Sequence, residues 1–326
     1  MQSDAAVLPV PPPEPEAVPA RRWLVHGAWL LATLVVTTFF GGWHYVGFLA
    51  EFGQAPPPLA PHELRFWLGG LWFSVPVLTI LGTHEAGHYL ACRRYHVDAS
   101  LPFFLPAPLP LTGTFGAFIR IRGVIPDKRA LFDIGASGPF AGFVVAVPLL
   151  VVGLWLSRVI PTPEVVLDVL ELGEPILYQV AAHAIWGTLP SGQVLHLHPM
   201  ALAAWFGLLA TAFNLFPLAQ LDGGHVAYAV FGTRARWITI ATAIGVVGLT
   251  LVSVSWVAWA VLLVIGLVVA GVAHPPTGND ALPLGRGRTL LALVAVVVFA
   301  LCFTPAPVEP VEPVETPAHA DTTSRR

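Results

Sequence analysis

The chain has 326 residues, of which 56% are hydrophobic and only 11% are charged. Soluble domains usually carry about a quarter charged residues. A mean hydropathy of +0.73 therefore indicates a protein whose main solvent is lipid. The net charge of −3, without any basic block, excludes nucleic acid as a partner. Cys92 and Cys302 lie far apart and in no CxxC pair, so the sequence indicates neither a disulfide framework nor a thiolate zinc site.

The two ends of the chain differ in composition from its middle. Residues 1–22 are rich in Pro and Ala, and residues 305–326 contain the run VEPVEPVE, so each is predicted to be a disordered tail, the first of them cytoplasmic. Residues 23–304 are predicted to form one membrane-embedded domain with its core at 66–232. The apolar run 23–49 is too long for the core of a signal peptide, and it predicts a first spanning helix.

Further apolar runs predict an all-α, polytopic membrane protein with about seven transmembrane helices. The predicted spans after the first are 66–92, 131–156, 201–221, two within 237–272 that are separated by a turn near 253–256, and 289–303.

A short β element is predicted between the second and third spans. Residues 101–111 are apolar but contain four prolines, which no helix tolerates at that spacing. Residues 113–125 read GTFGAFIRIRGVI, and their partial alternation predicts a membrane-associated strand or hairpin. Non-helical backbone at membrane depth requires cover by protein or a wet cavity.

Charge in the loops predicts the orientation. With seven alternating spans, the Arg and Lys residues near the span ends fall on one side, while the acid-containing loop 157–198 falls on the other. By the positive-inside rule, the N-terminus and the ends of spans two and four face the cytoplasm. The short chain with Pro-rich tails suggests the bacterial inner (plasma) membrane.

One motif in the second span carries metal chemistry. His84 and His88 are four residues apart, so a helix places both imidazoles on one face, with Glu85 beside them. This H-E-x-x-H arrangement is typical of zinc hydrolases in which the Glu is the general base. The alternative is a pair of helix-end histidines that reach the membrane interface. It is disfavoured because ionisable residues inside spans are costly and usually functional.

A catalytic zinc also needs a third protein ligand and one open position. Asp222 is the first candidate, because it lies at the cytoplasmic end of span four as His88 lies near that of span two. Asp127 and Asp133 are weaker candidates for the third ligand. Asp127 can instead form a solvated ion pair with its basic neighbours, and Asp133 can instead stabilise the N-terminus of a helix. Cys92 lies four residues after His88 and can complete a site, although a buried thiol used in packing is commoner.

Each of the following groups allows two interpretations. Asn214 can hold a developing oxyanion or can bond to a neighbouring helix. Gly223-Gly224 can let the backbone approach a metal or can stop a helix. His225 is a helix-end histidine or a group behind the ligands, whereas His196 and His198 fall on the far side of the membrane and are excluded from the site.

Two motifs together resemble the site-2 protease family of intramembrane metalloproteases. The first is HEAGH at 84–88, and the second is NLFPLAQLDGG at 214–224, which is similar to the family pattern N-x-x-P-x-x-x-L-D-G. GTFG at 113–116 and SGPFAG at 137–142 resemble segments of the branch with chloroplast and bacterial members. The resemblance covers roughly residues 66–232.

The resemblance implies one Zn²⁺ per chain, held by His84, His88 and Asp222. It implies that Glu85 activates water and that Asn214 positions the scissile carbonyl. The expected activity is cleavage in or near the transmembrane segments of membrane proteins, with a single-span substrate, and the hairpin near 113–123 would pair with the unwound substrate. Some members carry a PDZ domain between spans, and we expect none in this sequence.

Two rival functions follow from the same residues. A membrane metal transporter or sensor also needs imidazole and carboxylate ligands in spans, but spans five to seven have no acid or histidine in their apolar centres to relay an ion. A non-catalytic relative that binds membrane helices is the other alternative. It has no need of a general base such as Glu85.

Overall fold

The structure is a computed structural model that describes residues 20–50, 59–162, 170–218 and 220–310. Within these ranges, three helices are apolar and long enough to cross a membrane: α1 (Ala20–Leu49), α2 (Leu64–Arg94) and α3 (Lys128–Leu156). They coincide with the first three predicted spans. Most of the two predicted tails lies outside the described residues, so their disorder stays a prediction.

The predicted later spans form helices, but these are shorter than expected. They are α5 (Pro199–Leu215), α7 (Ala235–Leu249), α8 (Ser255–Ala270) and α9 (Arg286–Cys302), each of 15–17 residues. A span needs about 20 residues, so the described helices do not confirm seven spans. Helix α5 ends before the predicted residue 221 because Pro217 follows Phe216, and a residue before proline avoids helical backbone.

Two helices occur where the sequence predicted none. Helix α6 (Asp222–Phe231) is followed by a 3-10 turn η1 (Gly232–Arg234), and it begins at the residue where a span was expected to end. Gly223-Gly224 therefore opens a helix, and its interpretation as a helix stop is wrong. Helix α4 (Ile176–Trp186) lies inside the predicted loop 157–198.

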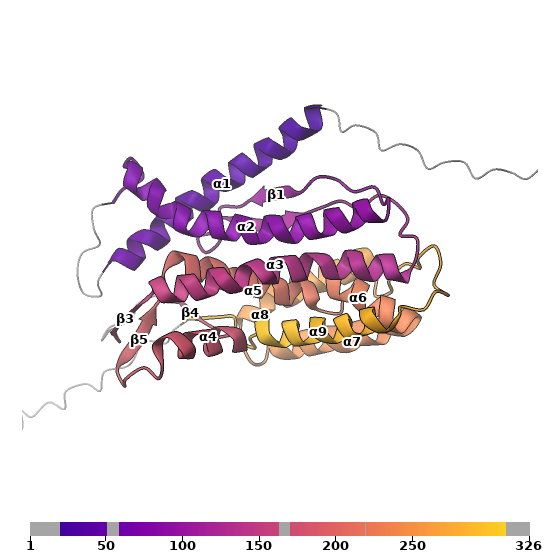
Figure 1. Cartoon of the computed structure of the whole chain (residues 1–326). Coiled ribbons are helices and arrows are strands. Elements are labelled where there is room, and N and C mark those ends of the chain that lie inside the picture. The colour runs from indigo at the N-terminus through magenta and orange to yellow at the C-terminus, as the bar shows by residue number, and fades with distance from the viewer. Residues whose placement is uncertain (1–19, 51–58, 163–169, 219, 311–326) are drawn as a thin grey trace, which may run out of the picture.

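The same loop contains short strands. Strand β3 (Arg158–Pro161) pairs antiparallel with β5 (Gln193–His196), and β4 (Leu170–Leu172) pairs antiparallel with β6 (Val308–Pro310). Strand β6 lies within the segment predicted as a tail and joins it to the loop after α3. Figure 1 shows β3, β5 and α4 at one end of the bundle, opposite the C-terminal end of α2 and the start of α6. This separation agrees with the predicted opposite placement of the acidic loop.

The β hairpin is present, with a different first strand from the one the sequence indicated. Strand β1 (Phe103–Pro106), from the proline-rich stretch, pairs antiparallel with β2 (Thr114–Phe118). The pairing shifts between Leu105 and Pro106 because proline offers no N–H to the ladder. The hairpin packs on α1. There, His44 Nε2 lies 3.1 Å from the Leu111 carbonyl oxygen.

The helices form layers around α2 and α3, which lie side by side (Figure 1). Helix α1 and the hairpin lie on one side of this pair, and α5 to α9 lie on the other. The largest apolar cluster joins α3, α5 and α9 around Leu150, Trp205 and Leu208, all essentially inaccessible. Close approach of α3 and α5 requires Gly153, where an added Cβ would lie 2.3 Å from the Ala201 backbone nitrogen.

One ion-pair network fixes the start of α9. Arg288 donates two hydrogen bonds of 2.8 Å to the Asp133 carboxylate and a third of 3.2 Å to the Tyr95 hydroxyl. Tyr95 also donates to Asp133. These contacts join α2, α3 and α9, so Asp133 is engaged in an ion pair. Asp127 accepts from the backbone N–H groups of Arg129 and Ala130 and caps α3, in place of the solvated ion pair considered from sequence.

Candidate metal centre

The H-E-x-x-H motif lies on the second half of α2 and faces the interior. His84, Glu85 and His88 are each 6% exposed. The helical period places the two imidazoles one turn apart on the face that packs against α3. Three buried polar side chains within five residues are costly without a compensating partner, which explains why other elements converge on them.

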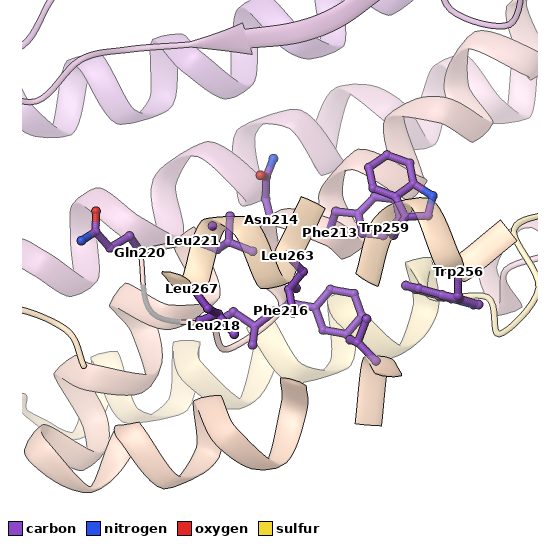
Figure 2. A pocket seen from close by; sticks show the side chains of 12 residues that line it. Phe213, Asn214, Phe216, Leu218, Gln220, Leu221, Trp256, Trp259, Leu263 and Leu267 are labelled. Atoms are coloured by element: carbon purple, nitrogen blue, oxygen red, sulfur yellow. The ribbon is translucent and has the colours of Figure 1, made fainter. Parts of the chain in front are cut away.

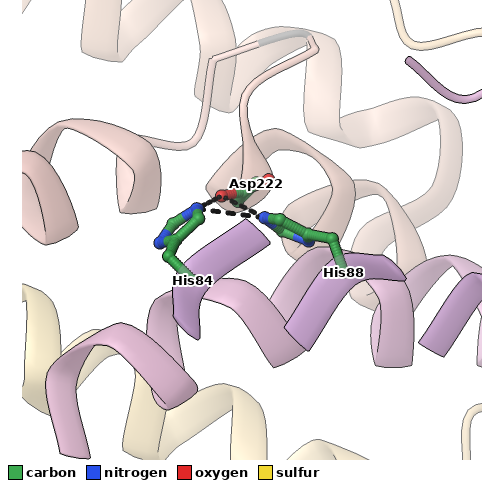
Figure 3. A group of neighbouring side chains, drawn as sticks. All are labelled: His84, His88 and Asp222. Carbon is green, nitrogen blue, oxygen red and sulfur yellow. Dashed lines mark hydrogen bonds and ion pairs between the residues drawn. The ribbon is translucent and has the colours of Figure 1, made fainter. Parts of the chain in front are cut away.

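Asp222 supplies that partner from α6. Its Oδ2 lies 3.2 Å from Nε2 of His84 and 3.2 Å from Nε2 of His88, and the two Nε2 atoms are 3.0 Å apart (Figure 3). The loop after α5 can bring Asp222 here because Gly223 touches the end of α5. An added Cβ on Gly223 would lie 2.1 Å from the Leu215 carbonyl oxygen.

The three atoms fit a metal ion. Zinc binds nitrogen and oxygen at about 2.0–2.2 Å, which places tetrahedral ligands roughly 3.3 Å apart, close to the separations observed. His88 Nδ1 lies 2.7 Å from the Ile134 carbonyl oxygen. The Nδ1–H therefore donates there, which leaves the Nε2 lone pair directed at the other two ligand atoms. Two imidazole lone pairs and a carboxylate at this spacing repel one another unless a cation or proton lies between them.

Small residues of α3 form the wall behind the motif. An added Cβ at Gly138 would lie 2.1 Å from His88 Nε2, and one at Gly142 would lie 3.3 Å from His84 Cβ. On α2, an added Cβ at Gly87 would lie 2.5 Å from the Ser137 carbonyl oxygen. The helices are thus in backbone contact at the site. Gly138 and Gly142 belong to the segment SGPFAG at 137–142 that the sequence analysis singled out.

The two predicted catalytic side chains flank the ligand atoms. Glu85 Oε1 lies 4.0 Å from His84 Nε2, and its carboxylate also accepts a backbone hydrogen bond from Ile119, just after β2. Asn214, the penultimate residue of α5, places its Nδ2 3.4 Å from His84 Nε2. Two segments from outside α2 therefore meet the motif, one from the hairpin and one from α5.

The weaker candidates supply none of the three clustered atoms. Cys92 is fully buried in an apolar cluster with Val97 and Ile134, which agrees with a packing role. His225 pairs with His274, whose Nε2 lies 2.7 Å from His225 Nδ1. No pattern in the sequence predicts this partner, because the loop 271–285 has no periodicity. His196 and His198 border β5 and the start of α5, at the far end of the bundle.

Comparison with known proteins gives a family match that spans the cluster. The profile of peptidase family M50 matches residues 72–254, which include all five predicted site residues. "Probable zinc metalloprotease EGY1, chloroplastic" from Oryza sativa subsp. japonica is 31% identical over 260 residues, covering 77% of this chain and 43% of the relative. The Arabidopsis thaliana protein of the same name is 29% identical over 236 residues, covering 70% of this chain and 42% of the relative.

A third relative shows the same pattern. "Probable zinc metalloprotease EGY2, chloroplastic" from Oryza sativa subsp. indica is 32% identical over 192 residues, covering 58% of this chain and 34% of the relative. The chain thus spans less than half of the length of these curated relatives. No solved structure matches it. The matched profile covers more than half of the sequence, and the chain belongs to peptidase family M50, the site-2 protease family that its two motifs predicted.

Proposed function

We propose that this protein is an intramembrane zinc metalloprotease that cleaves peptide bonds in or near the transmembrane segments of membrane proteins. The observation that carries the proposal is the convergence of His84, His88 and Asp222, from α2 and α6, to mutual separations of 3.0–3.2 Å beside Glu85. The names of the relatives, which describe zinc metalloproteases, support the choice of metal and of reaction.

The proposed roles follow from the positions of the side chains. His84, His88 and Asp222 would hold one Zn²⁺, which when bound supplies a Lewis acid and lowers the pKa of a bound water to about 7. Glu85 accepts a proton from the attacking water and returns it to the leaving amine. Asn214 directs its amide N–H toward the carbonyl oxygen of the bond that is cut.

The hairpin offers a means to hold the substrate. A transmembrane helix hides its peptide bonds in hydrogen bonds, so a segment must unwind before water can attack. Within the described residues, β2 pairs only with β1 and leaves its other edge without a strand. Because the chain just after β2 contacts Glu85, an unwound segment of a single-span substrate that adds to this edge passes beside the catalytic group.

We propose that the N-terminus and the site-bearing end of α2 face the cytoplasmic side. Arginines at the C-terminal end of α2 and at the start of α9 support this orientation. The position of the acidic loop at the opposite end of the bundle supports it as well. The sequence analysis suggested a bacterial inner membrane. The relatives named above are chloroplastic proteins of plants, which does not support that choice, and we propose no particular membrane.

Replacing Glu85 tests the proposal. Glu85→Gln keeps the size of the side chain and removes the base, so purified protein should retain its metal and lose cleavage of a membrane-spanning peptide by at least 100-fold. Zinc content by elemental analysis and cleavage by mass spectrometry give the two readouts. Cleavage that survives in Glu85→Gln would contradict the assignment. Zinc flux into vesicles that is independent of Glu85 would favour a transporter.

A further inference from the structure

An apolar pocket of about 310 Å³ lies between the segment after α5 and helices α7 and α8 (Figure 2). Its floor consists of buried side chains that belong to one cluster. These are Phe216, Leu218, Val246 and Trp256. More exposed residues, among them Trp259 on α8 and Leu221 just before Asp222, form its mouth.

One residue, Asn214, lies next to both the pocket and the metal centre. Asn214 lines the pocket, and its amide nitrogen lies 3.4 Å from His84 Nε2. Figure 2 shows Asn214 at the edge of the pocket, with its amide directed away from Phe216 and Leu218. The segment that forms the pocket wall therefore continues directly into the ligand Asp222. An occupant of the pocket lies beside the place where a scissile carbonyl would bind.

The size and lining of the pocket limit what it can hold. A helix with its side chains is about 10–12 Å wide, which is too large for this volume. A volume near 310 Å³ is at the lower end of pockets that hold small ligands, about 300–1,000 Å³. The lining is aromatic and aliphatic, with Asn214 and Gln220 as its polar members. Such a site suits one large apolar side chain on a backbone that stays outside.

We propose that this pocket binds one bulky apolar side chain, of leucine or phenylalanine size, from the unwound membrane segment of the substrate, and so selects the position of the cut. The inference rests on the proposed protease function. A lipid acyl chain is the other possible occupant. The wall shared with Asn214 favours the substrate, because an acyl chain has no amide to present at the metal centre.

Two glycines allow a substitution that obstructs the pocket and a matched control that does not. An added Cβ at Gly266, an exposed lining residue on α8, meets no atom within 4 Å, so Gly266→Leu can obstruct the mouth. Gly248 on α7 is equally open but does not line the pocket, so Gly248→Leu is the matched control. Trp256 is unsuitable, since it is buried and its indole N–H donates to the Pro305 carbonyl oxygen.

The cleavage experiment uses alanine-based membrane-spanning peptides with lysine flanks and a central Gly-Pro to promote unwinding. A single Leu, Phe or extra Ala is placed at successive positions near the centre. In detergent, the unaltered protein should cut at a fixed offset from the bulky residue. It should favour Leu or Phe over Ala about 10- to 100-fold in kcat/KM. This ratio should fall towards one in Gly266→Leu and stay unchanged in Gly248→Leu.

A binding measurement separates this inference from the proposed function. In the Glu85→Gln protein, a peptide carrying 4-bromophenylalanine should quench tryptophan emission, and both Trp259→Phe and Gly266→Leu should reduce that quenching. Trp259 is a suitable reporter because it is 38% exposed and stacks on Phe213, with ring centroids 3.9 Å apart.

The outcomes are distinct. Absence of cleavage by zinc-loaded protein, with quenching intact, would contradict the protease function and keep the pocket as a site for apolar side chains. Cleavage without a fixed offset, or equal losses in Gly266→Leu and Gly248→Leu, would overturn the pocket inference alone. A co-purified lipid that Gly266→Leu releases without a change in the Leu-to-Ala ratio would identify an acyl-chain site and would also overturn it.

Discussion

The imidazole of His88 has almost no freedom in this structure. Its Nδ1 is held by the Ile134 carbonyl oxygen at 2.7 Å, and its Nε2 faces both His84 and Asp222. On its remaining side the ring touches the bare backbone of Gly138 on α3. A ligand whose ring is confined from several directions is preorganised for a metal, so the wall of the site matters as much as the ligands.

Gly138→Ala should therefore disturb the metal centre. The added methyl would lie 2.1 Å from His88 Nε2, so the ring must turn away or α3 must move from α2. We expect the affinity for zinc to fall by about 10- to 100-fold, the range seen when groups that orient a metal ligand are removed. Competition with a chromogenic zinc chelator measures the change.

Two other glycines calibrate this result. Gly142→Ala places its methyl 3.3 Å from His84 Cβ, a contact that a small shift relieves, and should weaken zinc binding less. Gly245→Ala on α7 meets no atom within 4 Å and should bind zinc normally. Equal affinities in all three variants would show that the wall has no role.

The two motifs contain all five residues that the sequence analysis proposed for the site. The spacing of His84 and His88 already fixes one helical face, and the second motif contains both Asn214 and Asp222. The sequence could not show that Gly138 touches an imidazole, because a stripe of small residues predicts close helix packing without naming the partner. Nor could the sequence indicate that the Ile134 carbonyl oxygen contacts His88 Nδ1, since every residue has a backbone carbonyl.

At the scale of single elements, helix ends were the hardest feature to predict. The sequence assigned Asp222 to the end of a span, whereas it is the first residue of α6. A pair of glycines is compatible with either end of a helix, and only the contact of Gly223 with the end of α5 decides between them. Strand β1 was hidden for a similar reason, because its prolines exclude a helix without excluding an edge strand.

The start of α5 gives a prediction on pH. His198 Nδ1 accepts a 3.2 Å hydrogen bond from the backbone N–H of Met200, which a protonated ring cannot do. Burial, with a smaller contribution from the charge of Arg158, lowers the pKa of His198 from 6.5 to about 4. The folded-state pKa lies below the unfolded value, so this stabilisation is complete above pH 6.5 and is lost as the pH falls towards 4.

His198→Asn keeps a helix-capping acceptor that cannot be protonated. Between pH 7 and pH 5, the unfolding temperature of the unaltered protein should fall by roughly 2–4 °C more than that of the variant, which corresponds to about 1 kcal/mol. Thermal unfolding in detergent at the two pH values measures the difference. An equal fall of the unfolding temperature in both proteins would assign the acid sensitivity to other groups. His196 is one such group, because burial lowers its pKa as well.

On the scale of the whole molecule, the metal centre joins parts that are remote in sequence. Asp222 is 134 residues from His88, and both α2 and α6 pack on α3. Hydropathy located the three longest helices, α1, α2 and α3, correctly, because long apolar runs are sufficient for that purpose. The length of the later helices, and the small sheets at the end that contains α4, depend on tertiary contacts that hydropathy does not report.

Metal removal should therefore destabilise the fold as well as inactivate the protein. A ligand present at 100 times its Kd stabilises a fold by about 2.7 kcal/mol. We thus expect chelation to lower the unfolding temperature by roughly 5–10 °C. Asp222→Ala should start from the lower value and should not respond to the chelator. A transition in the unaltered protein that is insensitive to chelation, despite loss of zinc, would contradict a structural contribution of the metal.

The distance between the two halves of the site also has a consequence for synthesis. A ribosome adds about 5–20 residues per second, so the 134 residues between His88 and Asp222 take roughly 7–27 s to make. During that interval α2 is already complete and its histidines lack their carboxylate partner. The nascent chain therefore cannot bring the three side chains together until the hairpin, α3, α5 and the start of α6 have been made.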